Sequence, residues 1–114
     1  MALYSELPIF KSSYDLLIYI FQTTKNFPKE YKYTLGEKLK TSLLELILAV
    51  FHANKTHDKS VFLDQVQTHT ETVRILLRIS HDLKIIPTEK FAHVSLLLES
   101  VSKQVAWWKR SIKQ

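Results

Sequence analysis

The chain contains a single glycine, Gly36, among its 114 residues. Average usage would give glycine about 7% of positions, and glycine supplies the positive backbone φ angles that many tight turns require. Sandwiches, barrels and doubly wound α/β folds depend on many such turns, and phosphate-binding loops depend on several glycines. We therefore expect an all-α protein. The length allows one hydrophobic core, so residues 1–114 are expected to form a single domain.

Three prolines and one polar segment divide the chain. Pro8, Pro28 and Pro87 mark helix boundaries, because proline is tolerated in a first turn but interrupts a helix interior. The segment 54–60 is polar and contains no apolar residue. The predicted helices span residues 9–26, 35–54, 60–84 and 88–112. Because short connections favour antiparallel neighbours, we expect an up-down-up-down antiparallel four-helix bundle.

A capping-box pattern marks the start of the second predicted helix. Thr34 and Glu37 are three residues apart, a spacing at which the hydroxyl and the carboxylate can each accept a hydrogen bond from a backbone N–H group. We therefore expect this helix to begin beside Thr34.

Apolar residues recur at helical spacing, which predicts one buried stripe on each helix. The expected stripes are Phe10, Tyr14, Leu17, Ile18 and Phe21; Leu35, Leu39, Leu43, Leu46, Ile47 and Val50; Phe62, Val66, Val73, Leu76, Leu77 and Leu83; and Phe91, Val94, Leu98, Val101, Val105 and Trp108.

Further apolar residues lie outside these stripes. A monomeric bundle needs an apolar stripe of about 100° on each helix, whereas several helices here are apolar around more of their circumference. A second buried surface is one interpretation, and it implies a homo-oligomer or a permanent partner. The alternative is an imprecise helical phase or a wider core. The off-stripe residues are Ile9, Leu16, Ile20, Leu44, Leu48 and Phe51, with Ile75, Ile79, Leu96 and Trp107 as the candidate oligomer interface.

The residues that would carry enzymatic chemistry are not arranged for it. There is no cysteine, and no two of the five histidines have the spacing of a helical metalloprotease site. His69 lies on the core stripe of the third predicted helix and is expected to be a hydrogen-bonded core residue. We predict no metal, no cofactor and no catalysis, with a small enzyme as the minority hypothesis. The first residues lack a signal-peptide pattern and no apolar run approaches a membrane span, so we expect a cytoplasmic protein without membrane contact.

The net charge of +5 comes from 16 Lys and Arg residues against 11 Asp and Glu. The cations gather in a loop rich in aromatic residues, in an arginine pair on the third helix, and near the C-terminus beside Trp107. Solvated cations and favourable helix-end charges are the alternative explanation. The candidate residues for contact with nucleic acid or a protein partner are Arg74, Arg78, Lys103, Lys109, Arg110, Lys29 and Lys32, with Lys113 in the same C-terminal cluster.

Several segments together resemble the bacterial Avd-like four-helix-bundle proteins, the accessory variability determinants of diversity-generating retroelements. The resemblance covers nearly the whole chain. The matching segments are Leu7–Lys11, Tyr14–Leu17, Thr24–Lys29, Tyr33–Leu39, Ala53–Lys55, Arg74–Arg78, Asp82–Lys84 and Trp108–Ser111. The chain departs from the family pattern at Ala106-Trp107, where small residues, often Gly-Gly, commonly precede the terminal tryptophan.

This resemblance implies a basic homopentamer of four-helix bundles that binds RNA or DNA. It also implies association with the retroelement reverse transcriptase during mutagenic copying, with no catalysis by the bundle protein itself. The bundle proteins encoded in intervening sequences of ribosomal RNA look similar. They provide the alternative of a structural interaction protein without a retroelement role.

Overall fold

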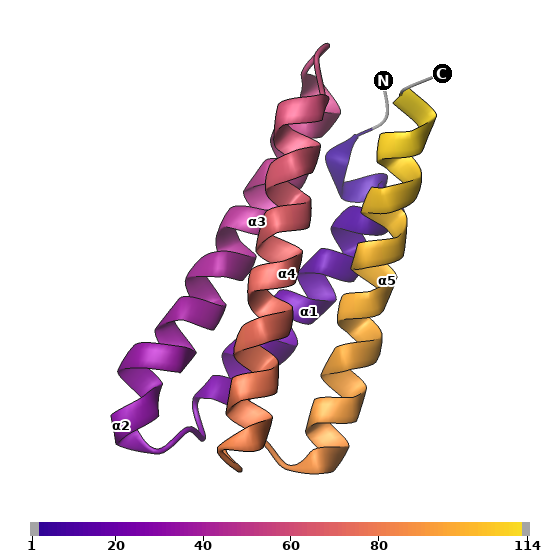
Figure 1. Ribbon diagram of the computed structural model, residues 1–114. Helices are drawn as coiled ribbons and strands as arrows, with labels where there is room; N and C mark the ends of the chain where they lie inside the picture. Colours follow the sequence, from indigo (N-terminus) through magenta and orange to yellow (C-terminus); the bar gives the residue numbers. More distant parts are fainter. Residues whose placement is uncertain (1–2, 113–114) are drawn as a thin grey trace.

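The computed structural model describes residues 3–112, and these form helices and turns without a β-strand. Figure 1 shows the long helices lying side by side. The elements are the 3-10 helix η1 (Tyr4–Glu6), α1 (Pro8–Thr24), α2 (Lys29–Tyr31), the π-helical segment η2 (Lys32–Gly36), α3 (Glu37–Lys55), α4 (Ser60–Asp82) and α5 (Thr88–Ile112).

The long helices form a four-helix bundle. Helix α1 packs against α3 and α5, and α4 packs against the same two helices, so that α1 and α4 are diagonal to each other. The chain reverses direction between successive long helices, which brings the start of α1 and the end of α5 to one end (Figure 1). The bundle measures 44 × 21 × 20 Å. The predicted all-α class and up-down-up-down arrangement agree with this architecture. None of the helices within residues 3–112 is long and apolar enough to span a membrane.

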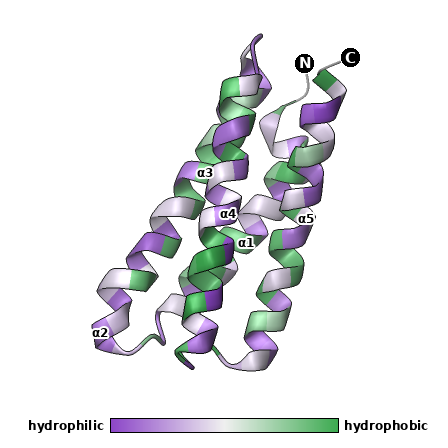
Figure 2. Cartoon of the chain, viewed as in Figure 1, coloured by the Kyte–Doolittle hydropathy of each residue, from purple (hydrophilic) through white to green (hydrophobic). Residues whose placement is uncertain are grey.

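Aliphatic side chains fill the bundle axis. Apolar residues recur along each long helix (Figure 2), and the predicted stripes of α3 and α5 supply most of their buried residues. The largest fully buried side chains are Leu16, Ile20, Leu39, Leu43, Leu46, Val50, Leu63, Val66, Val73, Leu77, Ile86 and Leu98.

The predicted phase of α1 is only partly correct: Leu17 is buried as expected, whereas two other residues of the stripe are not. Tyr14 is 50% exposed and Ile18 38% exposed, although the apolar spacing predicts both in the core. Ile9, Leu16 and Ile20 are buried instead. The core therefore takes the face of α1 that carries Ile9, Leu16, Leu17 and Ile20.

The aromatic side chains beside α1 form a cluster at the edge of the α1–α3 pair. The Tyr4 ring of η1 lies 5.0 Å from both the Phe10 ring and the Phe51 ring, in edge-to-face geometry. The Phe10 ring in turn stacks on that of Tyr14 at 6.3 Å. Such pairs are stabilising without full burial, which explains why an aromatic stripe occurs outside the core.

The predicted capping box is not formed. The Thr34 hydroxyl donates to the carbonyls of Glu30 and Tyr31, both at 3.3 Å, instead of accepting from a helix N-terminus. The chain is helical from Lys29 to Lys55 through the π-helical segment, so the second helical region begins six residues earlier than expected, at Lys29 rather than residue 35. Pro28 immediately precedes the first residue of α2, so the predicted helix boundary at this proline agrees with the structure.

The third predicted long helix, by contrast, ends two residues earlier than expected. Helix α4 ends at Asp82, and Leu83 lies half exposed in the following turn instead of in the core. Lys84 adopts a positive φ of 62°, which reverses the chain toward α5. Ile86 supplies the buried contact after the turn.

Gly36 lies within the helical region rather than in a turn, with a φ of −61°. A Cβ atom there would meet the Phe27 ring and the Tyr31 carbonyl oxygen at 3.6 Å, an ordinary contact distance. No turn therefore requires the single glycine of the chain.

We predict that Gly36→Ala raises the free energy of unfolding by about 0.5–1 kcal/mol, because alanine restricts the unfolded chain and fits the native backbone. Chemical denaturation measures this change. Gly36→Val is the contrasting variant, since its branched side chain would crowd Phe27, and it should destabilise the protein. Destabilisation by Gly36→Ala would contradict the assigned helical conformation.

Candidate functional site

The start of α1 and the end of α5 lie at the same end of the bundle (Figure 1). The side chains there line a groove of about 980 Å³. We call it the terminal groove. Three separate parts of the chain form it: the start of α1, the α3–α4 connection and the last turns of α5. Its lining residues are Leu7, Pro8, Ile9, Asn54, Lys59, Lys103, Gln104, Trp107, Trp108 and Arg110.

The wall formed by α1 depends on Pro8. Leu7 is extended, with φ −71° and ψ 130°, and Pro8 then starts the helix, which directs Ile9 into the core. The neighbouring helix is fixed by a hydrogen bond of 2.8 Å from the Gln104 amide to the Ser12 hydroxyl. This contact joins α5 to α1 beside the groove.

Lys59 lines the side of the groove next to the end of α3. Its ammonium donates to the carbonyls of Ala53, Asn54 and Thr56 at 2.7, 3.3 and 2.9 Å. It also lies 5.9 Å from the Trp108 ring centre. A cation at these carbonyls satisfies acceptors that the end of a helix leaves unpaired. The positive charge of Lys59 is therefore occupied by backbone carbonyls at the end of α3.

Two consecutive tryptophans differ in their surroundings because neighbouring helix residues are about 100° apart. Trp108 is half buried and packs against the core, whereas Trp107 is 63% exposed. Trp107 thus presents a large apolar surface at the mouth of the groove.

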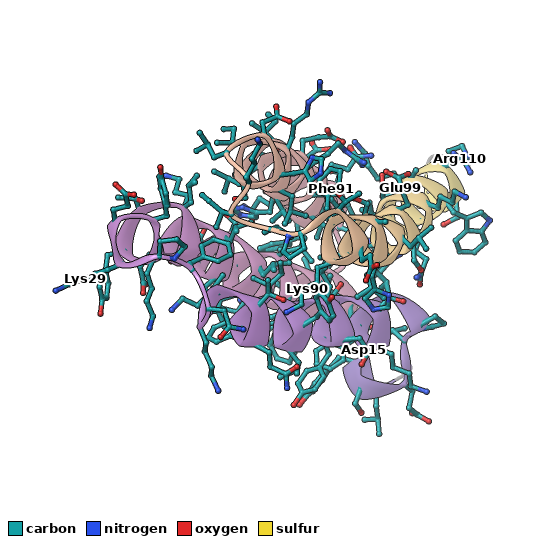
Figure 3. The ribbon with its side chains drawn as sticks, turned by 90° about the horizontal axis from the view of Figure 1, so that it is seen from below. Asp15, Lys29, Lys90, Phe91, Glu99 and Arg110 are labelled. Carbon is teal, nitrogen blue, oxygen red and sulfur yellow. The ribbon has the colours of Figure 1, made fainter. Side chains whose placement is uncertain are left out.

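Two exposed cations lie beside Trp107. Lys103 and Arg110 make no ion pair or hydrogen bond with any residue in the described range 3–112. Arg110 projects from the end of α5 away from the bundle (Figure 3). The groove lining contains no carboxylate. The sequence-based association of these two cations with Trp107 is therefore seen in the fold.

Arg74, by contrast, is engaged within the chain. Its guanidinium bonds to Glu71 on the same helix at 3.2 Å and to Glu99 on α5. The hydrogen bond to Glu99 raises the pKa of Arg74 above its ordinary value, against a smaller lowering by burial, and Glu71 raises it further. Glu99 lies on the side of α5 that faces α4 (Figure 3). Arg74 acts as a clamp between these two helices.

Lys109 makes a second link between α5 and α4. Its ammonium lies 2.5 Å from an Asp64 carboxylate oxygen and 2.9 Å from the Gln67 amide oxygen. Its side chain is largely covered. Lys109 is therefore paired with α4, whereas the adjacent Arg110 has no partner within residues 3–112 and points away from the bundle (Figure 3). Lys113 lies outside the described residues.

The remaining candidate cations occupy the opposite end of the bundle. Arg78 is 79% exposed and its nearest carboxylate, Asp82, is 3.8 Å away. Lys29 projects outward from the start of α2 (Figure 3). Lys32 follows in η2, where the Tyr33 ring is exposed. The candidate cations are thus divided between the two ends.

The predicted interface residues are exposed on the outer faces of α4 and α5. Leu96 is 72% and Ile75 59% exposed, and Ile79 and Trp107 are also accessible. Exposed apolar residues also occur on α1 and α3, the two helices on the side of the bundle opposite α4 and α5. They are Tyr14, Ile18, Leu44 and Leu48.

One histidine pairs with a carboxylate across the α3–α4 contact. His69 lies 3.5 Å from Glu45 and its side chain is 23% exposed, so it lies at the margin of the core rather than inside it as its position on the stripe predicts. Within residues 3–112, no group of three or more His, Cys, Asp or Glu side chains is placed to hold a metal ion.

Most of the groove lining could not be identified from the sequence. Leu7, Pro8, Asn54, Lys59 and Gln104 belong to segments that are far apart in the chain. The tandem tryptophans were the available signal, because only one of two adjacent helix residues can face the core.

The fold and these surfaces define a basic helical-bundle protein with exposed apolar faces and an apolar groove at one end. The chain belongs to the bAvd-like family, whose model matches residues 7–112. The resemblance recognised in the sequence is confirmed by this match. No curated protein matches the chain.

We predict that Arg74→Met lowers the free energy of unfolding by about 0.5–1 kcal/mol, because it removes a partly exposed ion-pair clamp. Arg78→Met is the matched control and should have little effect, since Arg78 is more exposed and its pair is longer. Equal effects of the two substitutions in thermal denaturation would contradict the distinction drawn between these arginines.

Proposed function

We propose that the protein is a non-enzymatic, cytoplasmic accessory protein of a diversity-generating retroelement. In this role a basic homo-oligomer binds nucleic acid and the reverse transcriptase to support mutagenic cDNA synthesis. The family match over residues 7–112 is the observation that carries the proposal. The helical bundle, the exposed apolar faces and the free cations are compatible with such a role.

Self-association is supported by the apolar surface that a single chain leaves exposed. Leu96 and Ile75 lie on the α4–α5 side, and Leu48 and Tyr14 lie on the α1–α3 side. Because the two faces differ, contact of one with the other between copies would be head-to-tail. Head-to-tail contacts produce closed rings when the rotation between subunits closes. The pentamer implied by the family resemblance is such a ring.

We predict that Ile75→Glu combined with Leu96→Glu reduces the mass in solution to that of one 13.4 kDa chain, because both changes place charge in an apolar contact. Light scattering measures the mass. His57→Glu adds a charge in the α3–α4 connection and should leave the assembly intact. A monomeric unmodified protein would contradict the proposed oligomer.

Nucleic-acid contact is assigned to the end of the bundle that carries Lys29, Lys32 and Arg78. These cations accompany the exposed Tyr33 ring, and aromatic rings beside cations suit single strands, whose bases can stack. A ring of subunits would repeat the set around one rim. The repeated set would compensate for the modest charge of +5 on each chain.

We expect the affinity for a single-stranded oligonucleotide to fall steeply with salt, since released counterions favour phosphate binding. In Lys29→Ala/Lys32→Ala, the slope of log affinity against log salt should decrease by about 1 for each phosphate that the variant can no longer neutralise. Fluorescence anisotropy measures both quantities, with Lys11→Ala as the control. Absence of binding at low salt would contradict nucleic-acid binding.

The second candidate function is that of a structural interaction bundle of the ribosomal intervening-sequence type. The internal pairing of Arg74 and Lys109 favours it, because two candidate phosphate contacts are occupied by carboxylates of the same chain. This alternative predicts the oligomer without useful nucleic-acid affinity, so the two experiments above separate the candidates.

A further inference from the structure

The terminal groove combines an apolar interior with unpaired positive charge at its mouth. Of the candidate oligomer-interface residues only Trp107 lines this groove, so contacts through Ile75 and Leu96 and phosphate binding at the opposite end both leave the combination unused. We propose that the terminal groove binds a short acidic peptide segment of a partner protein. One apolar side chain of the segment enters the groove, and its carboxylates pair with Lys103 and Arg110.

The interior of the groove suits a side-chain anchor. Leu7, Pro8 and Trp108 contribute apolar atoms to its lining, and Trp107 extends that surface outward. The volume of about 980 Å³ is comparable with ligand pockets and exceeds the needs of one side chain. Peptide contacts commonly obtain most of their energy from one or two anchors of this kind. An aliphatic or aromatic anchor fits the lining.

The charges around the groove select the flanking residues of the peptide. Lys59, Lys103 and Arg110 are the charged residues of the lining, and no acidic side chain accompanies them. Lys59 is occupied by three carbonyls, whereas Lys103 and Arg110 have no partner in the described part of the chain. Carboxylates complement these two cations, and basic flanking residues would be repelled.

The same features favour a peptide over a polynucleotide. A polynucleotide presents a phosphate at every nucleotide, and its affinity grows with the number of phosphates that cations contact. Lys103 and Arg110 offer only two unpaired charges at the groove. The opposite wall, formed by Leu7 and Pro8, offers no cation to a second stretch of phosphate backbone. An apolar anchor flanked by one or two carboxylates would contact both the apolar lining and the two unpaired cations.

The test uses the complete protein and fluorescein-labelled synthetic peptides. In each peptide, a Leu, Phe or Trp anchor is flanked by Asp or Glu at varied spacing, and a matched peptide carries Asn or Gln instead. We expect anisotropy to detect binding of acidic peptides and an affinity at least about tenfold weaker for the amide versions. Binding should also change the fluorescence of the tryptophans at the groove.

Two charge-changing variants define the binding surface. Lys103→Glu/Arg110→Glu should lose the acidic peptides and bind versions whose anchors are flanked by Lys. Both side chains are exposed and unpaired, so this variant is expected to fold, and recovered binding to the basic peptides would verify that. Lys90→Glu, on the first turn of α5 at the other end of the bundle, should bind the acidic peptides normally.

Three results would overturn the proposal. They are failure of every acidic peptide in the set to bind, binding unaffected by Lys103→Glu/Arg110→Glu, and displacement of the peptide by an oligonucleotide that loses affinity in that same variant. The last result would assign the groove to nucleic acid. Retention of peptide binding by Lys29→Ala/Lys32→Ala, together with a reduced oligonucleotide salt slope, would show that the two sites are separate.

Discussion

Packing of aliphatic side chains along the bundle axis is the interaction on which the other features depend. Leu16, Ile20, Leu43 and Leu98 are fully buried from three different helices. Each such side chain contributes roughly 1.5–3 kcal/mol through removal from water. The axis is narrow, so the core takes one face of each helix. Aromatic and aliphatic residues on the other faces remain exposed, and these form the surfaces proposed for assembly.

The fold was largely predictable because its strongest signals are local. The polar segment 54–60 located the start of α4, and Pro87 located the start of α5. The errors arose where tertiary contacts outweighed local patterns. In α1, Tyr14 has the spacing of a core residue, but its ring stacks on the Phe10 ring at the edge of the α1–α3 pair. At Thr34, the local capping pattern yielded to a helix that had already begun at Lys29.

The site was less predictable, because partners distant in sequence decide what each cation does. Arg74 pairs with Glu99, and Lys109 pairs with Asp64, across separations that helical spacing does not encode. Arg110 is adjacent to Lys109 yet remains unpaired within the described residues. Clustering in the sequence therefore did not distinguish the cations that pair within the chain from those that stay unpaired in the described residues.

We propose that other copies of the chain cover the outer apolar faces. Hydroxyl-radical footprinting of the unmodified protein tests it most directly, because oxidation follows the solvent exposure of individual side chains. Leu48, Ile75 and Leu96 are 55%, 59% and 72% exposed in the single chain. We predict that these three side chains become protected from oxidation as the protein concentration rises. Oxidation at the level of fully exposed side chains at every concentration would contradict the claim.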